Sequence, residues 1–141
     1  MLDQAAFAAW VRGASYDELD LLLRGERRRE TLDALFAGMP ETFRADRAGD
    51  LSAVVHWHVH GPAEGAEDVY QVVIGDGRCA TGPVGDQVPR LTLRLDAVNF
   101  VRMATGNAAA WTLFLRGKLK ARGDLGLTRT FPTLFDVPSP A

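Results

Sequence analysis

The apolar positions in the first forty-odd residues repeat every three or four residues, which predicts helices. The first run consists of Leu2, Ala6, Phe7 and Trp10. Gly13 ends this run, and Ser15 with Glu18 then forms a capping-box pattern, in which each side chain binds a free backbone N–H of the other residue. A third stripe consists of Leu32, Leu35, Phe36, Met39 and Phe43, with Pro40 expected to kink or restart its helix.

From Leu51 the repeat shortens to every second residue, which predicts strands. The inward positions of the first strand are Leu51, Ala53, Val55, Trp57 and Val59. A second strand is expected over 69–74 and a return strand over 78–81, because Gly75-Asp76-Gly77 is typical of a hairpin turn. Residues 91–95 alternate as a fourth strand.

The C-terminal third contains two capping signals. Asp96 is placed to cap a helix that ends at Gly106, with Leu95 and Phe100 as its hydrophobic staple. A short helix over 108–115 and a fifth strand over 117–122 should follow, and Asp124 should cap a last helix. This order of elements predicts an α+β fold, with a five-stranded, mainly antiparallel sheet and helices covering one face.

Composition narrows the class of protein. The chain has 141 residues, of which 47% are hydrophobic and 24% charged, an ordinary balance for one globular domain. The net charge of -2 gives no reason to expect a nucleic-acid partner. No apolar run approaches the roughly 20 residues that span a bilayer. A single cysteine, Cys79, and an N-terminus without a signal-peptide pattern predict a cytoplasmic location.

The segment from Phe100 to Leu127 carries glycines and a Lys-x-Lys pair at fixed offsets. A helix ending in Thr105-Gly106 is followed by Phe114-Leu115-Arg116-Gly117-Lys118-Leu119-Lys120 and then by Gly123-Asp124-Leu125-Gly126. This pattern resembles the C-terminal signature of the sterol carrier protein type 2 (SCP-2 sterol transfer) family. The upstream strands and hairpin occur in the expected order, so the resemblance covers roughly residues 30 to 131.

The resemblance implies a sheet covered on one side by helices, with an apolar tunnel between the layers. The tunnel would hold a sterol, a fatty acyl chain or another long apolar ligand, with neither catalysis nor a cofactor. Ala109-Ala110 stand where the family often has Asn-Pro, and the bulky Trp111 that follows is able to narrow or plug the tunnel. We expect a helical extension over 1–28, a lipid-binding domain over 29–135 and a tail over 136–141.

The candidate lining residues are apolar and are expected to turn toward the inner face of the sheet. They are Trp57, Val59, Phe100, Met103, Trp111, Phe114, Leu115, Leu125, Leu127 and Phe131. A cavity between such groups attracts an apolar ligand at about 25 cal/mol per Å² removed from water. The alternative is that these side chains pack against one another and leave no space, as most interiors do. Pattern alone favours packing, whereas the resemblance favours a tunnel.

Candidate metal and catalytic groups are few. His56, His58 and His60 alternate on the outward face of one strand, where the outer two lie roughly 13 Å apart and cannot share an ion. We therefore expect no metal site, and a solvated or interface-facing stripe instead. The sequence contains no Gly-x-Ser-x-Gly, P-loop or dinucleotide-binding motif, so we predict no enzymatic activity. An enzyme that uses a cofactor in the cavity is the most distant alternative.

A basic stripe follows the last predicted strand, at Arg116, Lys118, Lys120 and Arg122. Two interpretations are open. The stripe could dock transiently on an anionic membrane during lipid pickup, with each charge contributing about 1 kcal/mol to membrane binding, or it could protect an edge strand against aggregation.

The main alternative function is an interaction or homodimerisation module. The same fold would be filled by its own side chains, and the N-terminal helices, with Leu2, Phe7 and Trp10, would dock a partner or a second copy.

Overall fold

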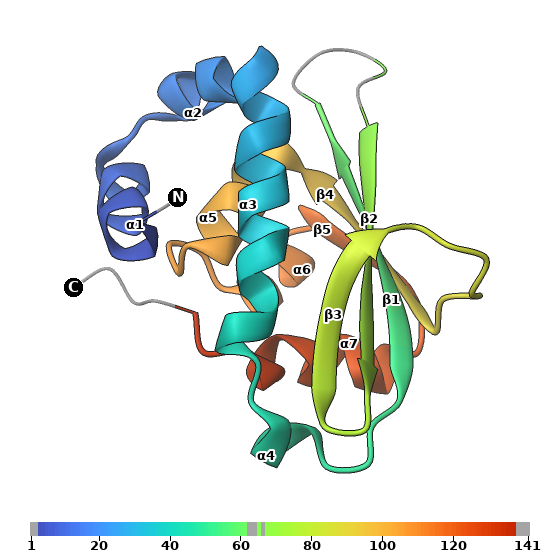
Figure 1. Ribbon diagram of the computed structural model, residues 1–141. Coiled ribbons are helices and arrows are strands. Elements are labelled where there is room, and N and C mark those ends of the chain that lie inside the picture. The colour runs from blue at the N-terminus through green and yellow to red at the C-terminus, as the bar shows by residue number, and fades with distance from the viewer. Residues whose placement is uncertain (1–2, 62–64, 66, 138–141) are drawn as a thin grey trace.

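The computed structural model describes residues 3–61, 65 and 67–137. Figure 1 shows a sheet with the helices gathered on one side of it. The sheet has five strands in the order β3-β2-β1-β4-β5, and only the central pair β1 and β4 is parallel. The predicted α+β class with a mainly antiparallel sheet is therefore confirmed. No helix within the described residues is long and apolar enough to cross a membrane.

The first three helices form as predicted: α1 (Gln4–Gly13), α2 (Tyr16–Leu22) and α3 (Glu26–Thr42). The capping box is present at the start of α2, where the Glu18 N–H donates to Ser15 Oγ at 3.1 Å and the Ser15 N–H donates to Glu18 Oε1 at 3.0 Å. Pro40 lies inside the last turn of α3 and cannot donate to the Phe36 carbonyl. That carbonyl instead accepts from Thr81 Oγ1 in the sheet, at 2.8 Å. The helix therefore continues to Thr42, and the short α4 (Ala45–Ala48) follows.

The strands are β1 (Ala53–His60), β2 (Glu67–Gly75), β3 (Arg78–Pro83), β4 (Leu91–Asp96) and β5 (Leu119–Gly123). The hairpin between β2 and β3 turns at Asp76 and Gly77, which both have positive φ, as the Asp-Gly pair predicts. Gly123 ends β5 with φ +115, and a Cβ there would lie 2.5 Å from the Arg90 carbonyl oxygen. This close approach explains the glycine at that position of the signature.

The C-terminal part contains α5 (Ala97–Ala104), α6 (Ala110–Leu115), α7 (Leu125–Thr130) and the 3-10 turn η1 (Phe131–Leu134). Asp96 and Asp124 cap α5 and α7 as predicted, each accepting from a backbone N–H at 3.0 Å. Several predicted boundaries differ from the structure, and β1 begins at Ala53 rather than at Leu51. The helix α6 begins at Ala110, and β5 begins at Leu119. The Lys118 N–H donates to the Leu113 carbonyl at 2.8 Å, so the backbone is still closing α6 there, and neither Arg116 nor Lys118 lies on the strand.

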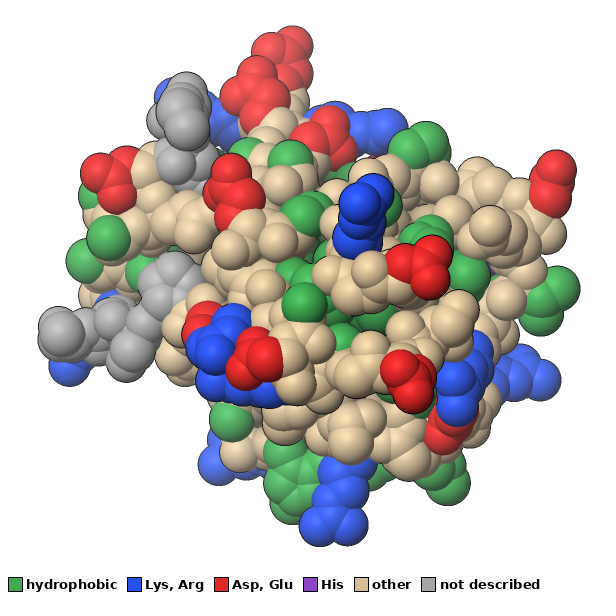
Figure 2. Space-filling view, turned by 60° about the horizontal axis from the view of Figure 1, so that its bottom comes forward, with side chains coloured by type: hydrophobic (Ala, Val, Ile, Leu, Met, Phe, Trp, Pro, Cys, Tyr) green, Lys and Arg blue, Asp and Glu red, His purple; other side chains and the backbone are tan. Residues whose placement is uncertain are grey.

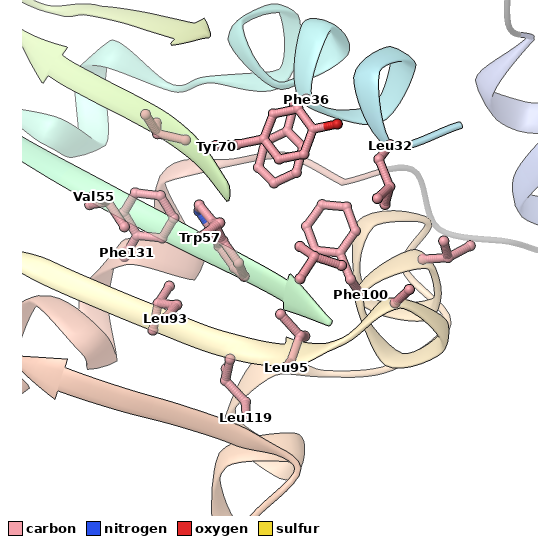
Figure 3. Close-up of a cluster of buried hydrophobic side chains, with 14 of the residues drawn as sticks. Leu32, Phe36, Val55, Trp57, Tyr70, Leu93, Leu95, Phe100, Leu119 and Phe131 are labelled. Carbon is pink, nitrogen blue, oxygen red and sulfur yellow. The ribbon is translucent and has the colours of Figure 1, made fainter. Parts of the chain in front are cut away.

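The core lies between the sheet and the helices. Its centre is a set of stacked and edge-on rings, shown in Figure 3: Phe36, Trp57, Tyr70, Phe100 and Phe131. Phe36 from α3 stacks on Tyr70 from β2 at 4.0 Å between ring centroids and on Phe100 from α5 at 4.7 Å. These contacts fix α3 and α5 on the same face of the sheet.

Candidate functional site

A cavity of about 240 Å³ lies between the sheet and the helices. Its walls are mostly apolar, and none of its described lining residues carries a charge. Trp57 comes from β1, and α3 supplies Leu35, Gly38 and Met39. The remaining walls come from α5 with its following loop, from α1, and from the segment after α7.

The wall formed by α1 was not anticipated from the sequence. Gln4 and Phe7 reach the cavity from this helix. Asn107 Nδ2 donates to the Ala8 carbonyl at 3.1 Å and so ties α1 to the loop after α5. Gly38 on α3 leaves room for the Gln4 side chain of α1, since a Cβ at position 38 would lie 2.6 Å from Gln4 Nε2. The alternative function, an interaction module, places Phe7 on a docking surface for a partner, whereas in the structure Phe7 is partly buried against the core.

The predicted lining residues divide into four groups. Trp57, Met103 and Phe131 line the cavity. Trp111 and Phe114 line a second cavity of about 240 Å³, which shares Ala109, Ala110 and Pro132 with the first. Val59, Phe100 and Leu127 are buried in the packed core and line neither cavity.

Leu115 and Leu125 form the fourth group, and the expectation that they face the sheet was wrong. Their side chains are 68% and 69% exposed. Both helices that carry them are only six residues long, so each presents few positions to the sheet. Leu113 takes the buried position on α6, and Leu127 with Thr128 takes it on α7.

Several cavity residues were missed: Leu35, Met39 and Phe135, besides Gln4 and Phe7. Leu35 and Met39 belong to the apolar stripe that predicted α3, so the signal was present but indicated only a buried face. Phe135 follows η1, and Phe43 and Phe135 form an isolated antiparallel bridge. Their rings lie 5.7 Å apart between centroids. This pairing joins residues 92 positions apart, and no local pattern announces it.

The histidines lie on the face of the sheet that carries no helices. His56 is buried, and its Nε2 lies 3.0 Å from Gln71 Oε1. The expected solvated stripe was therefore wrong for this residue. Gln71 Oε1 also accepts from the Gly85 N–H at 3.4 Å, so the connection between β3 and β4 lies close to it. His58 Nδ1 lies 3.0 Å from Glu67 Oε1, and this hydrogen bond is the largest influence lowering the pKa of Glu67. The described residues contain no group of three side chains able to hold a metal ion.

Other shifted groups also lie outside the cavity. Burial raises the pKa of the Cys79 thiol to about 11. Burial, and then the hydrogen bond to Asp33 at 2.5 Å, raise the pKa of Tyr70. Both groups are therefore uncharged at neutral pH, and neither borders the apolar cavity.

The comparisons with known proteins identify the class. The SCP-2 sterol transfer family matches residues 32–136. The chain belongs to this family, and the resemblance at residues 100–127 is confirmed. No curated protein matches the chain. The match begins inside α3, so α1 and α2 lie outside it.

Solved structures share the fold at low identity. The sterol carrier protein domain 2 of Helicoverpa armigera has a TM-score of 0.59 at 16% identity, over 86% of this chain and 89% of that one. Palmitated SCP2L2 from Aedes aegypti has a TM-score of 0.56 at 13% identity, over 77% and 93%. The sec-alkylsulfatase Pisa1 from Pseudomonas sp. has a TM-score of 0.64 at 19% identity, over 86% of this chain and 19% of the sulfatase. The chain therefore spans about a fifth of the sulfatase, and the fold also occurs as a part of an enzyme.

Proposed function

We propose that the protein binds and transfers a lipid or another long apolar ligand in the cavity lined by Trp57, Met103 and Phe131, without catalysis. The observation that carries this proposal is the uncharged, apolar wall of the cavity. Membership of the SCP-2 sterol transfer family supports it, as does the palmitated state of the Aedes aegypti relative. The ligand is held by the hydrophobic effect, which depends on area rather than on a specific head group.

The size of the cavity bounds the affinity. At about 30 Å³ for each water-sized group, 240 Å³ accommodates about eight non-hydrogen atoms. Eight methylenes at about 0.8 kcal/mol each contribute about 6 kcal/mol, which corresponds to a dissociation constant of tens of micromolar. A longer chain gains more by continuing past Ala109, Ala110 and Pro132 into the second cavity. Trp111 and Phe114 then contact the far end of the ligand.

Membrane contact is part of the same proposal. The residues Arg116, Lys118, Lys120 and Arg122 are all exposed. The hydrophobic side chains Trp111, Leu115 and Leu125 are exposed in the same part of the chain, and Arg129 lies over the Trp111 ring. Figure 2, which brings the end with α4 and α7 forward, shows hydrophobic side chains exposed beside basic ones. Apolar anchors among cations suit the surface of an anionic bilayer.

Vesicle co-sedimentation tests this contact. Binding to phosphatidylserine-containing vesicles should weaken about thirtyfold in the Lys118→Ala, Lys120→Ala double variant, at about 1 kcal/mol per charge. Equal binding of both proteins would show that the stripe only protects the sheet edge.

A homodimerisation module remains the alternative, and Trp10 is the observation that favours it. Its side chain is 44% exposed and stacks on Phe7 at 5.9 Å between ring centroids. Sedimentation of the wild type and of the Trp10→Ala variant separates the two roles. If Trp10 docks a second copy, its replacement should change the oligomeric state and leave lipid binding intact.

Native mass spectrometry of the gently purified protein, followed by denaturing extraction, tests the main proposal. A stoichiometric apolar adduct supports the carrier. A mass that corresponds to the bare chain, unchanged after incubation with fatty acids and sterols, would contradict it. A cytoplasmic location is expected for such a carrier and stays a prediction.

A further inference from the structure

Among the described residues that line the cavity, Trp57 is the one with a buried polar side-chain atom that lacks a hydrogen-bond partner. Its side chain is 2% exposed and lines the cavity, yet its Nε1 has no hydrogen-bond acceptor. Figure 3 shows this nitrogen on the edge of the indole that faces Phe131, whose ring centroid lies 6.0 Å away. Phe131 lines the same cavity.

A buried N–H without an acceptor is uncommon in folded proteins, because it loses its bond to water and gains nothing in return. The other polar side chains around this cavity are differently placed. The hydroxyls of Thr42 and Thr105 donate to the Met39 and Val101 carbonyls, at 3.1 Å and 2.7 Å. Gln4 lies on the opposite wall, on α1. The Trp57 indole N–H is thus a hydrogen-bond donor on the sheet side of the cavity without an acceptor among the described residues.

We propose that the Trp57 indole N–H anchors a neutral oxygen of the ligand, such as the carbonyl of an ester or ketone or the oxygen of an alcohol. This inference rests on the proposed function and adds the chemical class of the ligand. An ionised carboxylate does not fit, because burying an unpaired charge is very costly and no Lys, Arg or His is among the described lining residues. The ligand therefore lies with its oxygen against the sheet, after a small movement of Phe131, and with its chain toward the other walls.

The first experiment compares methyl octanoate, decane and octanoate by titration into two proteins. One is the wild type, and the other carries benzothienylalanine in place of Trp57, which exchanges the N–H for sulfur in a ring of nearly the same shape. Because each ligand is compared with itself, its hydration cancels. The exchange should weaken methyl octanoate about three- to tenfold and leave decane within about twofold. The same exchange at Trp10, which lines neither cavity, serves as the matched control and should preserve the affinity of methyl octanoate and of decane.

The outcomes separate the two proposals. If neither decane nor the ester binds the wild type, the proposed function fails. If both bind and the exchange affects them equally, only the anchor fails. Tighter binding of octanoate than of methyl octanoate at pH 8 would overturn the choice of a neutral oxygen.

The indole resonance of Trp57 gives an independent readout. In a Trp10→Phe, Trp111→Phe background, the single remaining indole N–H signal should move downfield with methyl octanoate and not with decane. A signal that stays upfield with both ligands would show that the N–H points at the Phe131 ring, and would overturn the anchor.

Discussion

Filling the cavity without weakening the fold is the sharpest perturbation that the structure offers, and Gly38→Leu achieves it. Gly38 lines the cavity from within α3, and the nearest atom to a Cβ added there is the amide end of Gln4, at 2.6 Å. That flexible side chain can move aside. Replacing a glycine in a helix also raises helix propensity by about 0.8 kcal/mol, so the variant should unfold at a temperature equal to or higher than that of the wild type.

The expected loss of binding follows from volume. Leucine adds four carbons to a space that accommodates about eight. Four displaced methylenes at about 0.8 kcal/mol each remove about 3 kcal/mol, a weakening of about one hundredfold. Displacement of a fluorescent fatty acyl ester measures this change, and a thermal melt confirms that the variant is folded.

Ala37→Leu is the matched control. It adds leucine to the adjacent, exposed position of the same helix and should leave the affinity unchanged. A folded Gly38→Leu protein with the affinity of the wild type would refute the assignment of the ligand to this cavity.

Three further predictions test separate parts of the account. Deleting residues 1–14 removes the wall formed by Gln4 and Phe7 and should lower ligand affinity about tenfold, as titration would show; an unchanged affinity would mean that α1 is not part of the site. The Asp136 carboxylate accepts hydrogen bonds from Arg44 at 2.6 Å and from Arg47 at 2.9 Å. These bonds lower the pKa of Asp136, and the bond from Arg44 has the largest effect. This carboxylate should stabilise the fold above the ordinary carboxyl pKa near 4, with the contribution lost as pH falls through the lowered value. Asp136→Asn should therefore reduce the denaturation midpoint at pH 7 and reduce it less as pH falls below about 4. If the difference in midpoint between the wild type and the variant were the same at every pH, the ion pairs would not be stabilising the fold. Cys79, with its pKa raised to about 11, should react with a thiol reagent at pH 8 on the order of one hundredfold more slowly than in the unfolded chain, and equal rates would contradict its burial.

The fold could be predicted from the sequence to the extent that it depends on local patterns. Each of the capping residues Ser15, Asp96 and Asp124 accepts from a backbone N–H only a few residues further along the chain, so the signal for each helix start is complete in the local sequence. The strand alternation through Trp57 worked for the same reason, because period two is fixed by the backbone. The boundary errors near Arg116 and Lys118 arose because a helix end and a strand start overlap there.

The cavity required contacts that no local pattern specifies. Asn107 and Ala8 are 99 residues apart, and their hydrogen bond places α1 against the site. Phe100 was predicted to line the cavity because it is apolar and faces the sheet, but its ring packs against Phe36 and Trp57 instead. Whether an apolar side chain borders empty space or another side chain depends on the packing of several elements together.

The most direct test of the central claim uses the methionine methyl groups as reporters. The chain has three methionines, at positions 1, 39 and 103, and both Met39 and Met103 line the cavity. With ¹³C-labelled ε-methyl groups, addition of a fatty acyl ester should shift the Met39 and Met103 signals and give nuclear Overhauser contacts from both to the acyl chain. Saturable ligand binding that leaves both signals unmoved and without such contacts would place the ligand elsewhere and contradict the account.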